Sequence, residues 1–588
     1  MSGLGLVLSI AKDALAAQRY GMDVTAHNIA NVNTPGYSRQ SLVHEAREPA
    51  PYGGVFLGRG VNTTQILRVS DQFIENQLMQ QHSSMLSSKE MENYMQVLEG
   101  FFNENSETSI SAMLAKFWNF WHDIANNPSG SSERIALYQH SVQLSEQFNA
   151  MNSDLTKIQG NLTNALKAGI DDINQITSEI AQLNNEIVRI EASSNANDFR
   201  DKRNALVSEL SEYLNVKSFE QDNGSITVVT ARGCILVHVD NSYCLELGGD
   251  TGDRVEWRGS GDTTTDITDY ITNGKLGGWL DVRDEVIAKY KLDLDAMAKE
   301  FIWAVNQQHS QGVGLEAFST VSGTYAATQG DAIPITASGL SYQSEIDDND
   351  KTFKIWRYDS NGEIYGGGAV TITLTPDETI DSLVTEINST DGLTAQFDAD
   401  SNKVTIAIDT AVISGGSFAF AEDTSNVLAA LGINTYFQGS GAESIAVNAI
   451  VNDKDYIAAA QINSSGNYVS GDNTNALAIV DLKYESRPIK QYTCVRGEDD
   501  TYENVTATLE DYYHSTVGSI GIKSASISRS NAFNEVMVNK LSEIRDSISA
   551  VSLDEEMTNL IKFQHAYTAA AKLISVSDEM LNILLSVK

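Results

Sequence analysis

Helically spaced apolar residues at both ends of this chain constrain its fold more than any other feature. The N-terminal run steps alternately by four and three residues, and its apolar members are Leu4, Leu8, Leu15, Met22 and Ile29. The C-terminal run repeats the alternation at Leu560, Phe563, Tyr567, Ile574, Leu581 and Leu584. Such steps keep one seam of a helix facing a partner helix. We therefore predict that the terminal helices pack as a coiled coil, with the rest of the chain looped out between them.

The N-terminal run meets a segment that should end its helix. Residues 28–40 are rich in Asn, Thr, Pro and Gly, which stop helices and favour turns, and they include Thr34, Pro35, Gly36 and Tyr37. Alone, this pattern predicts a turn and nothing more. The matching C-terminal seam favours polymer contacts instead, because termini usually fray unless they are tied down.

Both ends also resemble a known family. The stretch from Asn28 to Tyr37 resembles the signature of flagellar rod, hook and hook-associated proteins, an Ala- and Asn-rich segment that ends in Thr-Pro-Gly-Tyr. Residues 552–567 and 577–581 resemble the C-terminal end of the hook-associated members, with His565 in place of an expected Gln or Arg. Both motifs at opposite ends of one long chain make the resemblance specific.

The resemblance implies a structural component of the bacterial flagellum that joins hook to filament by self-assembly through its terminal helices. Implied partners are further copies in a ring-like assembly, the hook protein, a second hook–filament junction protein and an export chaperone at the C-terminal helix. It also implies secretion through the flagellum's own export channel after a transient stay in the cytoplasm. The implied polymerisation or chaperone interface consists of Leu4, Leu8, Leu15, Met22, Ile29, Thr34, Pro35, Gly36, Tyr37, Leu560, Phe563, Tyr567, Ile574, Leu581 and Leu584.

The charge of the chain excludes one class of partner. The 588 residues carry a formal net charge of -38, which argues against nucleic-acid binding because that needs a basic face. Residues 311–509 hold 28 acidic and 9 basic residues, whereas residues 1–43 hold two acids and three bases. We expect the acidic region to face solvent and the nearly neutral ends to be buried among copies. No signal peptide and no apolar run of about eighteen residues is visible, so we expect no membrane insertion.

The pattern along the chain predicts an α+β multidomain fold. A helix over 132–192 would be a rod roughly 90 Å long, at 1.5 Å per residue. We predict three parts: residues 1–60 with 551–588 form the terminal coiled-coil polymerisation domain, and residues 61–310 with 510–550 form a helical-bundle rod with a β excursion at 216–273. Residues 311–509 form the inserted β-rich outer part, in which 368–438 resembles an insert module of flagellar proteins.

No motif indicates catalysis, a cofactor or a metal. Asp398, Asp400, Asn402 and Asp409 fit part of a calcium-loop pattern, but Lys403 stands where that loop needs Gly, so a hairpin turn is the better interpretation. Phosphate loops, serine elbows and zinc-ligand spacings are missing from the sequence. Of the three cysteines, Cys234 and Cys244 could bridge two strands, although reduced thiols are the more usual state.

Three alternatives stay open at this stage. A hook or distal-rod protein shares the terminal motifs, but such proteins are mainly β between their ends and would lack the helix at 132–192. A surface enzyme carried on an axial scaffold would need a His, Asp and Glu cluster within 311–509, where the sequence has no histidine. A monomeric coiled-coil adhesin predicts stable termini in isolation.

Overall fold

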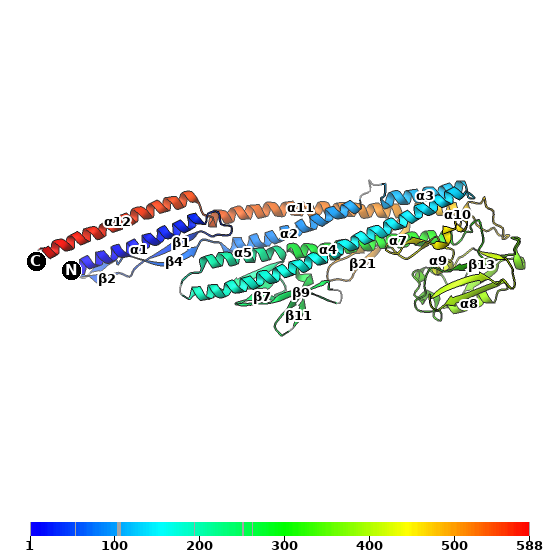
Figure 1. The fold of residues 1–588 in the computed structure, drawn as a ribbon, viewed down its shortest axis with the longest axis horizontal. Helices are drawn as coiled ribbons and strands as arrows, with labels where there is room; N and C mark the ends of the chain where they lie inside the picture. The colour runs from blue at the N-terminus through cyan, green and yellow to red at the C-terminus, as the bar shows by residue number, and fades with distance from the viewer. Residues whose placement is uncertain are drawn as a thin grey trace. The chain divides into compact units, whose positions relative to one another are not determined.

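The computed structural model describes residues 2–52, 55–102, 107–192, 194–249, 252–261 and 263–586. The chain forms two compact units, one of Met1–Tyr94, Leu162–Val282 and Ala525–Lys588, the other of Met95–Asn161 and Arg283–Ser524. The predicted α+β class is confirmed, since long helices alternate with small antiparallel sheets (Figure 1). The three-part division expected from the sequence stays a prediction.

In the first unit the two terminal helices lie side by side (Figure 1), as their matching seams predicted. Helix α1 spans Ser2–Ala30 and helix α12 spans Leu553–Ser586. Three acids, Asp554, Glu555 and Glu556, fill the first turn of α12, where negative charge complements the helix dipole. The preceding helix α11 spans Leu509–Ser549, so the chain breaks near Ala550 before α12 begins.

A β ribbon follows α1 and contacts it. Strand β1 (Gln40–Ala46) pairs antiparallel with β4 (Val61–Arg68), and a register shift between Val43 and His44 marks a bulge. Strands β2 (Ala50–Tyr52) and β3 (Val55–Leu57) continue the ribbon as a second antiparallel pair.

The rest of the first unit packs small sheets against helices. Part of helix α4 (Ser131–Glu191), which matches the predicted 132–192 helix, contributes Leu166, Ile173 and Ile180 to a core with no exposed surface at these three side chains. The predicted β excursion is confirmed as one sheet ordered β5-β6-β7-β8 and one ordered β11-β10-β9. The bounds are α2 Gln72–Phe101, α5 Asn197–Tyr213, β5 Val216–Glu220, β6 Ile226–Thr230, β7 Ile235–His238, β8 Asn241–Ser242, β9 Cys244–Gly248, β10 Arg254–Arg258, β11 Thr264–Asp266 and α6 Gly274–Asp281.

The second unit has an aromatic core among α3 (Ile110–Asn126), α4 and α7 (Ala288–His309). Phe117, Trp118 and Trp121 are buried, and Phe117 meets Phe301 edge to face with ring centroids 5.3 Å apart. At the end of α7, the buried His309 contacts two backbone groups: its Nδ1 lies 2.8 Å from the Asn434 carbonyl oxygen, and its Nε2 accepts from the Ala458 N–H at 2.9 Å. Both ring nitrogens are therefore satisfied when the imidazole is neutral.

The β-rich region of the second unit contains short antiparallel sheets ordered β12-β16-β15 and β14-β13-β17. Asp398 pairs with Lys403 at the end of the β15–β16 hairpin, which confirms the turn expected there. A π-helical turn spans Val282–Ile287. The bounds are β12 Thr320–Ser322, β13 Lys351–Tyr358, β14 Val370–Leu374, α8 Ile380–Asn388, β15 Leu393–Asp398, β16 Lys403–Ile408, β17 Ser417–Ala421, α9 Val427–Leu431, β18 Phe437–Gln438, β19 Ala446–Val447, α10 Thr474–Asp481, β20 Arg487–Thr493 and β21 Thr501–Ala507.

Candidate assembly site at the terminal helices

Helices α1 and α12 form an antiparallel pair, and two contacts fix its register. Asn28 donates to Glu556 at 3.1 Å, and seven residues away on each helix Gly21 lies against the ring of Phe563. A Cβ added to Gly21 would stand only 2.8 Å from that ring. Glycine at this position therefore lets α12 approach closely, and the seven-residue step is the heptad spacing of a coiled coil.

The predicted seam residues take different positions in this pair. Leu560, Phe563 and Ile574 are partly buried, whereas Tyr567 and Leu581 remain about two-fifths exposed, at 38% and 42%. On α1, the partly buried members are Leu4, Leu15, Met22 and Ile29, while Leu8 is exposed. The side chain of Leu584 lies outside the described part of the chain. The role of this set as a polymerisation or chaperone interface stays a prediction.

A second apolar surface runs along α12 away from α1. It consists of five exposed side chains, which we call the outer stripe: Met557, Ile561, Val576, Met580 and Ile583. At 3.6 residues per turn these positions lie about a quarter-turn or more around the helix from Glu556 and Phe563. Sequence reasoning missed the stripe because it followed one seam only, although steps of three or four within each of its two parts, Met557 with Ile561 and Val576 with Met580 and Ile583, carry the signal.

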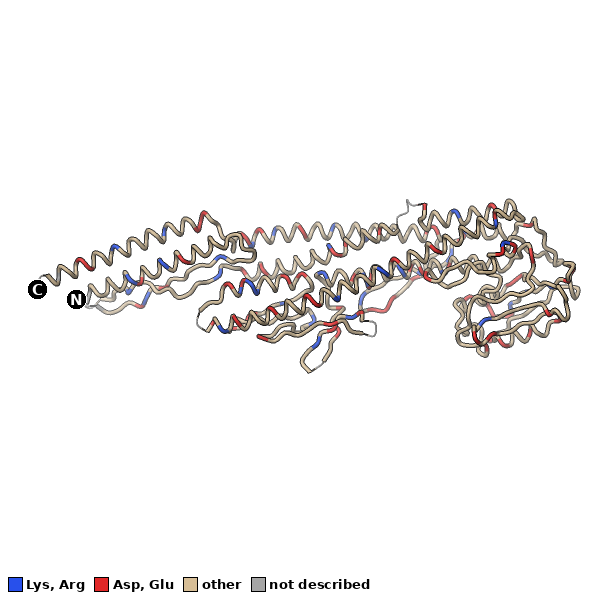
Figure 2. The backbone as a smooth tube through the Cα atoms, in the orientation of Figure 1, with Lys and Arg blue, Asp and Glu red and all other residues tan. Residues whose placement is uncertain are grey.

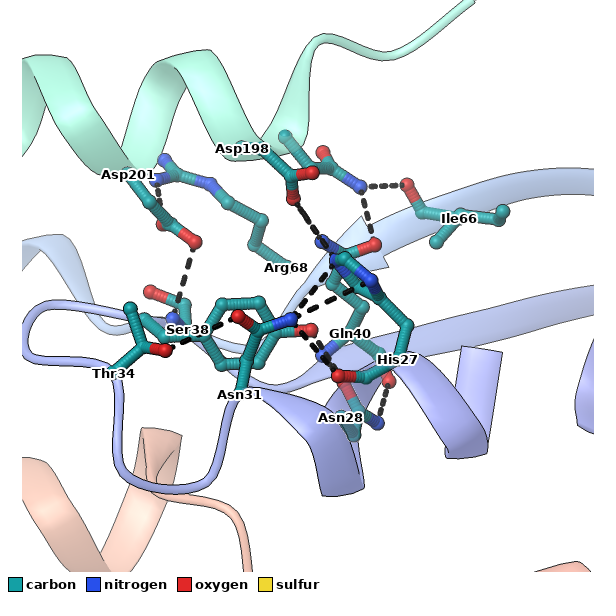
Figure 3. Close-up of polar contacts among 12 residues, drawn as sticks. His27, Asn28, Asn31, Thr34, Ser38, Gln40, Ile66, Arg68, Asp198 and Asp201 are labelled. Atoms are coloured by element: carbon teal, nitrogen blue, oxygen red, sulfur yellow. Dashed lines mark hydrogen bonds and ion pairs between the residues drawn. The ribbon is translucent and has the colours of Figure 1, made fainter. Parts of the chain in front are cut away.

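A polar network around Asn28 joins the C-terminal end of α1 to the start of α12. The Asn28 side chain is buried, with 1% exposure. Its Nδ2 donates to the backbone oxygen of Gln40 at 2.9 Å, and its Oδ1 accepts from the Gln40 N–H at 3.0 Å (Figure 3). The same Nδ2 also donates to Glu556, and the same Oδ1 also accepts from the Tyr37 hydroxyl at 2.8 Å. One buried side chain thus joins helix α1, the turn, strand β1 and helix α12. We call Asn28, Tyr37, Arg39, Gln40 and Glu556 the helix-end network.

Arg39 extends this network across the break between α11 and α12. Its Nε donates to Glu556 at 2.8 Å and its guanidinium reaches Glu555 at 3.0 Å, while its backbone N–H donates to the Ser549 oxygen at 2.9 Å. The Glu556 side chain is 3% exposed, whereas that of Glu555 is 64% exposed. Because buried charges need partners, Arg39 and Asn28 are what make the burial of Glu556 tolerable.

Helix α5 supplies the other side of the site (Figure 3). Gln40 donates to Asp198 at 2.8 Å, and Asp201 accepts from the Ser38 N–H at 3.1 Å and from Arg68 at 2.6 Å. The turn and both strands of the ribbon are therefore fastened to one helix.

The electrostatic setting keeps Tyr37 a hydrogen-bond donor. Burial, followed by the carboxylates of Asp198, Asp201 and Glu556, raises the pKa of Tyr37 above its ordinary value. Within the same turn, Gly36 has a φ of 76°, a left-handed conformation that suits glycine, and the Thr34 hydroxyl donates to Asn31 at 3.1 Å. Thr34, Pro35 and Gly36 are exposed, so Tyr37 is the member of the predicted turn that enters the network.

The described residues offer little for other kinds of chemistry. No group of three His, Cys, Asp or Glu among them could hold a metal ion, and no helix of the described chain is long and apolar enough to cross a membrane. All three cysteines are free, so Cys234 and Cys244 do not pair in this structure.

Comparison with known proteins gives matches at both ends and in the middle of the chain. Residues 8–37 match the family model described as flagella basal body rod protein, and residues 546–587 match that of the flagellar basal body rod FlgEFG protein C-terminal. Residues 95–321 match the flagellar hook-associated protein FlgK helical domain. The chain is therefore a structural component of the bacterial flagellum, of the hook-associated class.

Relatives agree with this over nearly the whole chain. Flagellar hook-associated protein 1 of Bacillus subtilis is 24% identical over 617 residues, covering 99% of this chain and 98% of the relative. The protein of the same name from Escherichia coli is 24% identical over 604 residues, covering 99% of this chain and 100% of the relative. The fold is that of a solved flagellar hook junction protein FlgK from Burkholderia pseudomallei, with a TM-score of 0.52, 16% identity, and coverage of 81% of this chain and 100% of that chain.

These findings confirm the resemblance to hook-associated protein 1 that the two ends of the sequence carried. The family consists of structural flagellar proteins, which agrees with the expectation that the chain is not an enzyme. They also support assembly of the chain into the flagellum together with hook components.

Proposed function

We propose that this protein joins hook to filament by self-assembly through its terminal helices. The observation that carries the proposal is the outer stripe: α12 already has a partner in α1, yet it presents a second row of apolar side chains to solvent. Met580 is 52% exposed and Ile583 is 62% exposed. Exposed apolar side chains gathered in this way, two near the start of α12 and three near its end, mark an interaction site.

The energy available from this stripe suits assembly. Fully burying one large aliphatic side chain contributes about 1.5–3 kcal/mol, so covering five half-exposed ones would contribute about 5 kcal/mol per subunit. After its first turn, α12 carries few charged residues (Figure 2): Lys562, Lys572, Asp578 and Glu579. Such a face loses little by leaving water.

We infer different roles for the two faces of α12. Before export, when α12 has not yet paired with α1, a chaperone would cover the seam residues Leu560, Phe563, Tyr567, Ile574 and Leu581. After export the same residues pack on α1, and the outer stripe meets neighbours. The neighbours in this proposal are further copies of the chain, the hook protein and a second junction protein.

The proposal also assigns a route and a division of labour. The chain leaves the cytoplasm through the flagellum's own export channel and acts at the cell exterior. Residues 1–60 with 551–588 polymerise, residues 61–310 with 510–550 form the rod, and the acidic residues 311–509 face solvent.

The test replaces outward-facing residues of α12 in a strain that lacks its own copy of the protein. Ile561→Asp with Val576→Asp should leave hooks complete and the chain exported, but should abolish filaments, because two carboxylates cannot be buried in the apolar contact. Phe219→Asp is the matched control, since Phe219 is 57% exposed on β5 and Ile561 is 52% exposed. Normal filament numbers from the double variant would refute the proposal.

A further inference from the structure

The tip of the β ribbon exposes three consecutive apolar side chains. Val55, Phe56 and Leu57 on β3 are 59%, 75% and 38% exposed. Successive residues of a strand point to opposite faces, so the tip is apolar on both of its faces. Exposed apolar hairpins of this kind are an association hazard unless a partner covers them.

The ribbon is held firmly enough to present this tip at a defined place. Arg47, just after β1, forms an ion pair with Asp13 of α1 at 2.8 Å, and its backbone N–H donates to the Gly60 oxygen at 3.0 Å. Gly60 has a φ of 88°, and a Cβ there would lie 3.4 Å from the Cα of Ile10. The base of the tip thus sits directly on the α1 backbone.

The tip and the outer stripe of α12 are different apolar surfaces of one unit. Both the ribbon and α12 contact α1, which lies between them in Figure 1. Both surfaces stay exposed within a single chain. When two different surfaces of identical copies fit each other, the contact is heterologous, and its repetition produces a ring or an open helix.

The charges beside the two surfaces are complementary. Arg59 is exposed and lies two residues after Leu57, the last residue of the apolar tip. On α12, the exposed Glu579 lies next to Met580 and within about a sixth of a turn of Val576 around the helix. A basic residue beside one apolar surface and an acidic residue beside the other would set the register of a contact between copies.

We propose that the ribbon tip of one copy packs on the C-terminal part of the outer stripe, Val576, Met580 and Ile583, of the next copy. Val55 and Leu57, which share one face of β3, lie on these three side chains, with Arg59 opposite Glu579. This inference rests on the proposed self-assembly and names the surface that would cover the stripe. It also makes each copy both donor and acceptor of a tip, which is the condition for a continuous ring or helix.

Cross-linking tests the contact directly. Cells would express two chains together, both with the three native cysteines replaced by Ser, one carrying Leu57→Cys and the other Met580→Cys. In flagella from these cells, oxidation should give a mixed disulfide dimer at a yield at least tenfold above the control pair Tyr484→Cys with Met580→Cys. A yield no higher than the control would overturn the inference.

Charge exchange is the second arm. Arg59→Glu should reduce filament number several-fold, and adding Glu579→Arg should restore it, because the pair is then reversed rather than lost. Val55→Asp should also reduce filament number, with Val469→Asp as a control of similar exposure, 62% against 59%. If Glu579→Arg fails to restore filaments in Arg59→Glu and Val55→Asp gives normal filaments, the tip contact is refuted while self-assembly still stands. Normal filament numbers from Ile561→Asp with Val576→Asp would instead refute self-assembly through the outer stripe.

Discussion

Glu556 is the carboxylate whose removal should loosen α12 most. It is buried at the first turn of that helix and accepts from both Arg39 and Asn28. Glu556→Ala would leave the Arg39 guanidinium without its closest partner and one Asn28 donor unpaired. Removing one member of a buried ion pair typically costs about 3–5 kcal/mol.

The expected cost here lies just below that range. The Arg39 side chain is 26% exposed and keeps Glu555, so water and the second carboxylate compensate part of the loss. We expect α12 to be less firmly held by about 2–3 kcal/mol. Since 1.4 kcal/mol corresponds to a factor of ten, this is roughly a 30- to 150-fold increase in local opening.

Amide hydrogen exchange on the full chain measures this opening. Exchange in residues 557–567 should accelerate by that factor in Glu556→Ala, because local opening controls exchange in a surface helix whose outer side chains are exposed. The matched control is Glu555→Ala, next to it in sequence and bound to the same arginine, where an exposed pair is worth about 0.5 kcal/mol and exchange should change about twofold. Equal acceleration in the two variants would refute the reasoning from burial.

Three further predictions concern glycine packing and pH. Gly21→Ala should weaken the α1–α12 pair by about 1–3 kcal/mol, because the new methyl would meet Phe563, whereas Gly5→Ala has open space and should not; exchange in α12 distinguishes them. Burial lowers the pKa of His309 to about 4 from the ordinary 6.5. Its contribution to the free energy of unfolding is therefore fully present above pH 6.5 and falls by up to about 3 kcal/mol as the pH drops from 6.5 to 4. Urea unfolding should show this fall in the unaltered chain, and His309→Gln should lack it. Burial raises the pKa of Glu75, so the stability of the fold decreases as the pH rises above the ordinary pKa of 4.5 and this carboxyl ionises. Glu75→Gln should therefore raise the melting temperature at pH 7, and this gain should disappear near pH 4.

The helices could be predicted from the sequence because their signals are local. The seam of α4 has a period of 3.6 over many turns, and the observed Ser131–Glu191 differs by one residue at each end from the expected 132–192. Both terminal helices, and the break between α11 and α12, follow from the same periodicity and from the residues that interrupt it.

The helix-end network could not be predicted, because its partners are far apart in the sequence. Asn28 and Glu556 are 528 positions apart, and Gln40 and Asp198 are 158 apart. Nothing near Glu556 distinguishes it from Glu555, yet one is buried and the other exposed. Only the packing of α12 on α1 decides which carboxylate enters the network.

The outer stripe was within reach of the sequence and was still missed. Its residues occupy helical spacing on the same segment as the predicted seam, so one helix carries two apolar faces. The periodicity shows both faces, but it does not say which face pairs within the chain and which remains for a neighbour. That assignment follows from Gly21, whose missing side chain admits Phe563.

The most direct test of the account asks whether the outer stripe is covered in the assembled flagellum. Ile561→Cys would be labelled with a maleimide in the free chain and in isolated flagella, with the exposed native Cys244 as an internal reference. If the stripe joins the subunits, labelling at position 561, relative to Cys244, should fall at least tenfold on assembly. Equal relative labelling in the two states would contradict the claim that this face joins the subunits.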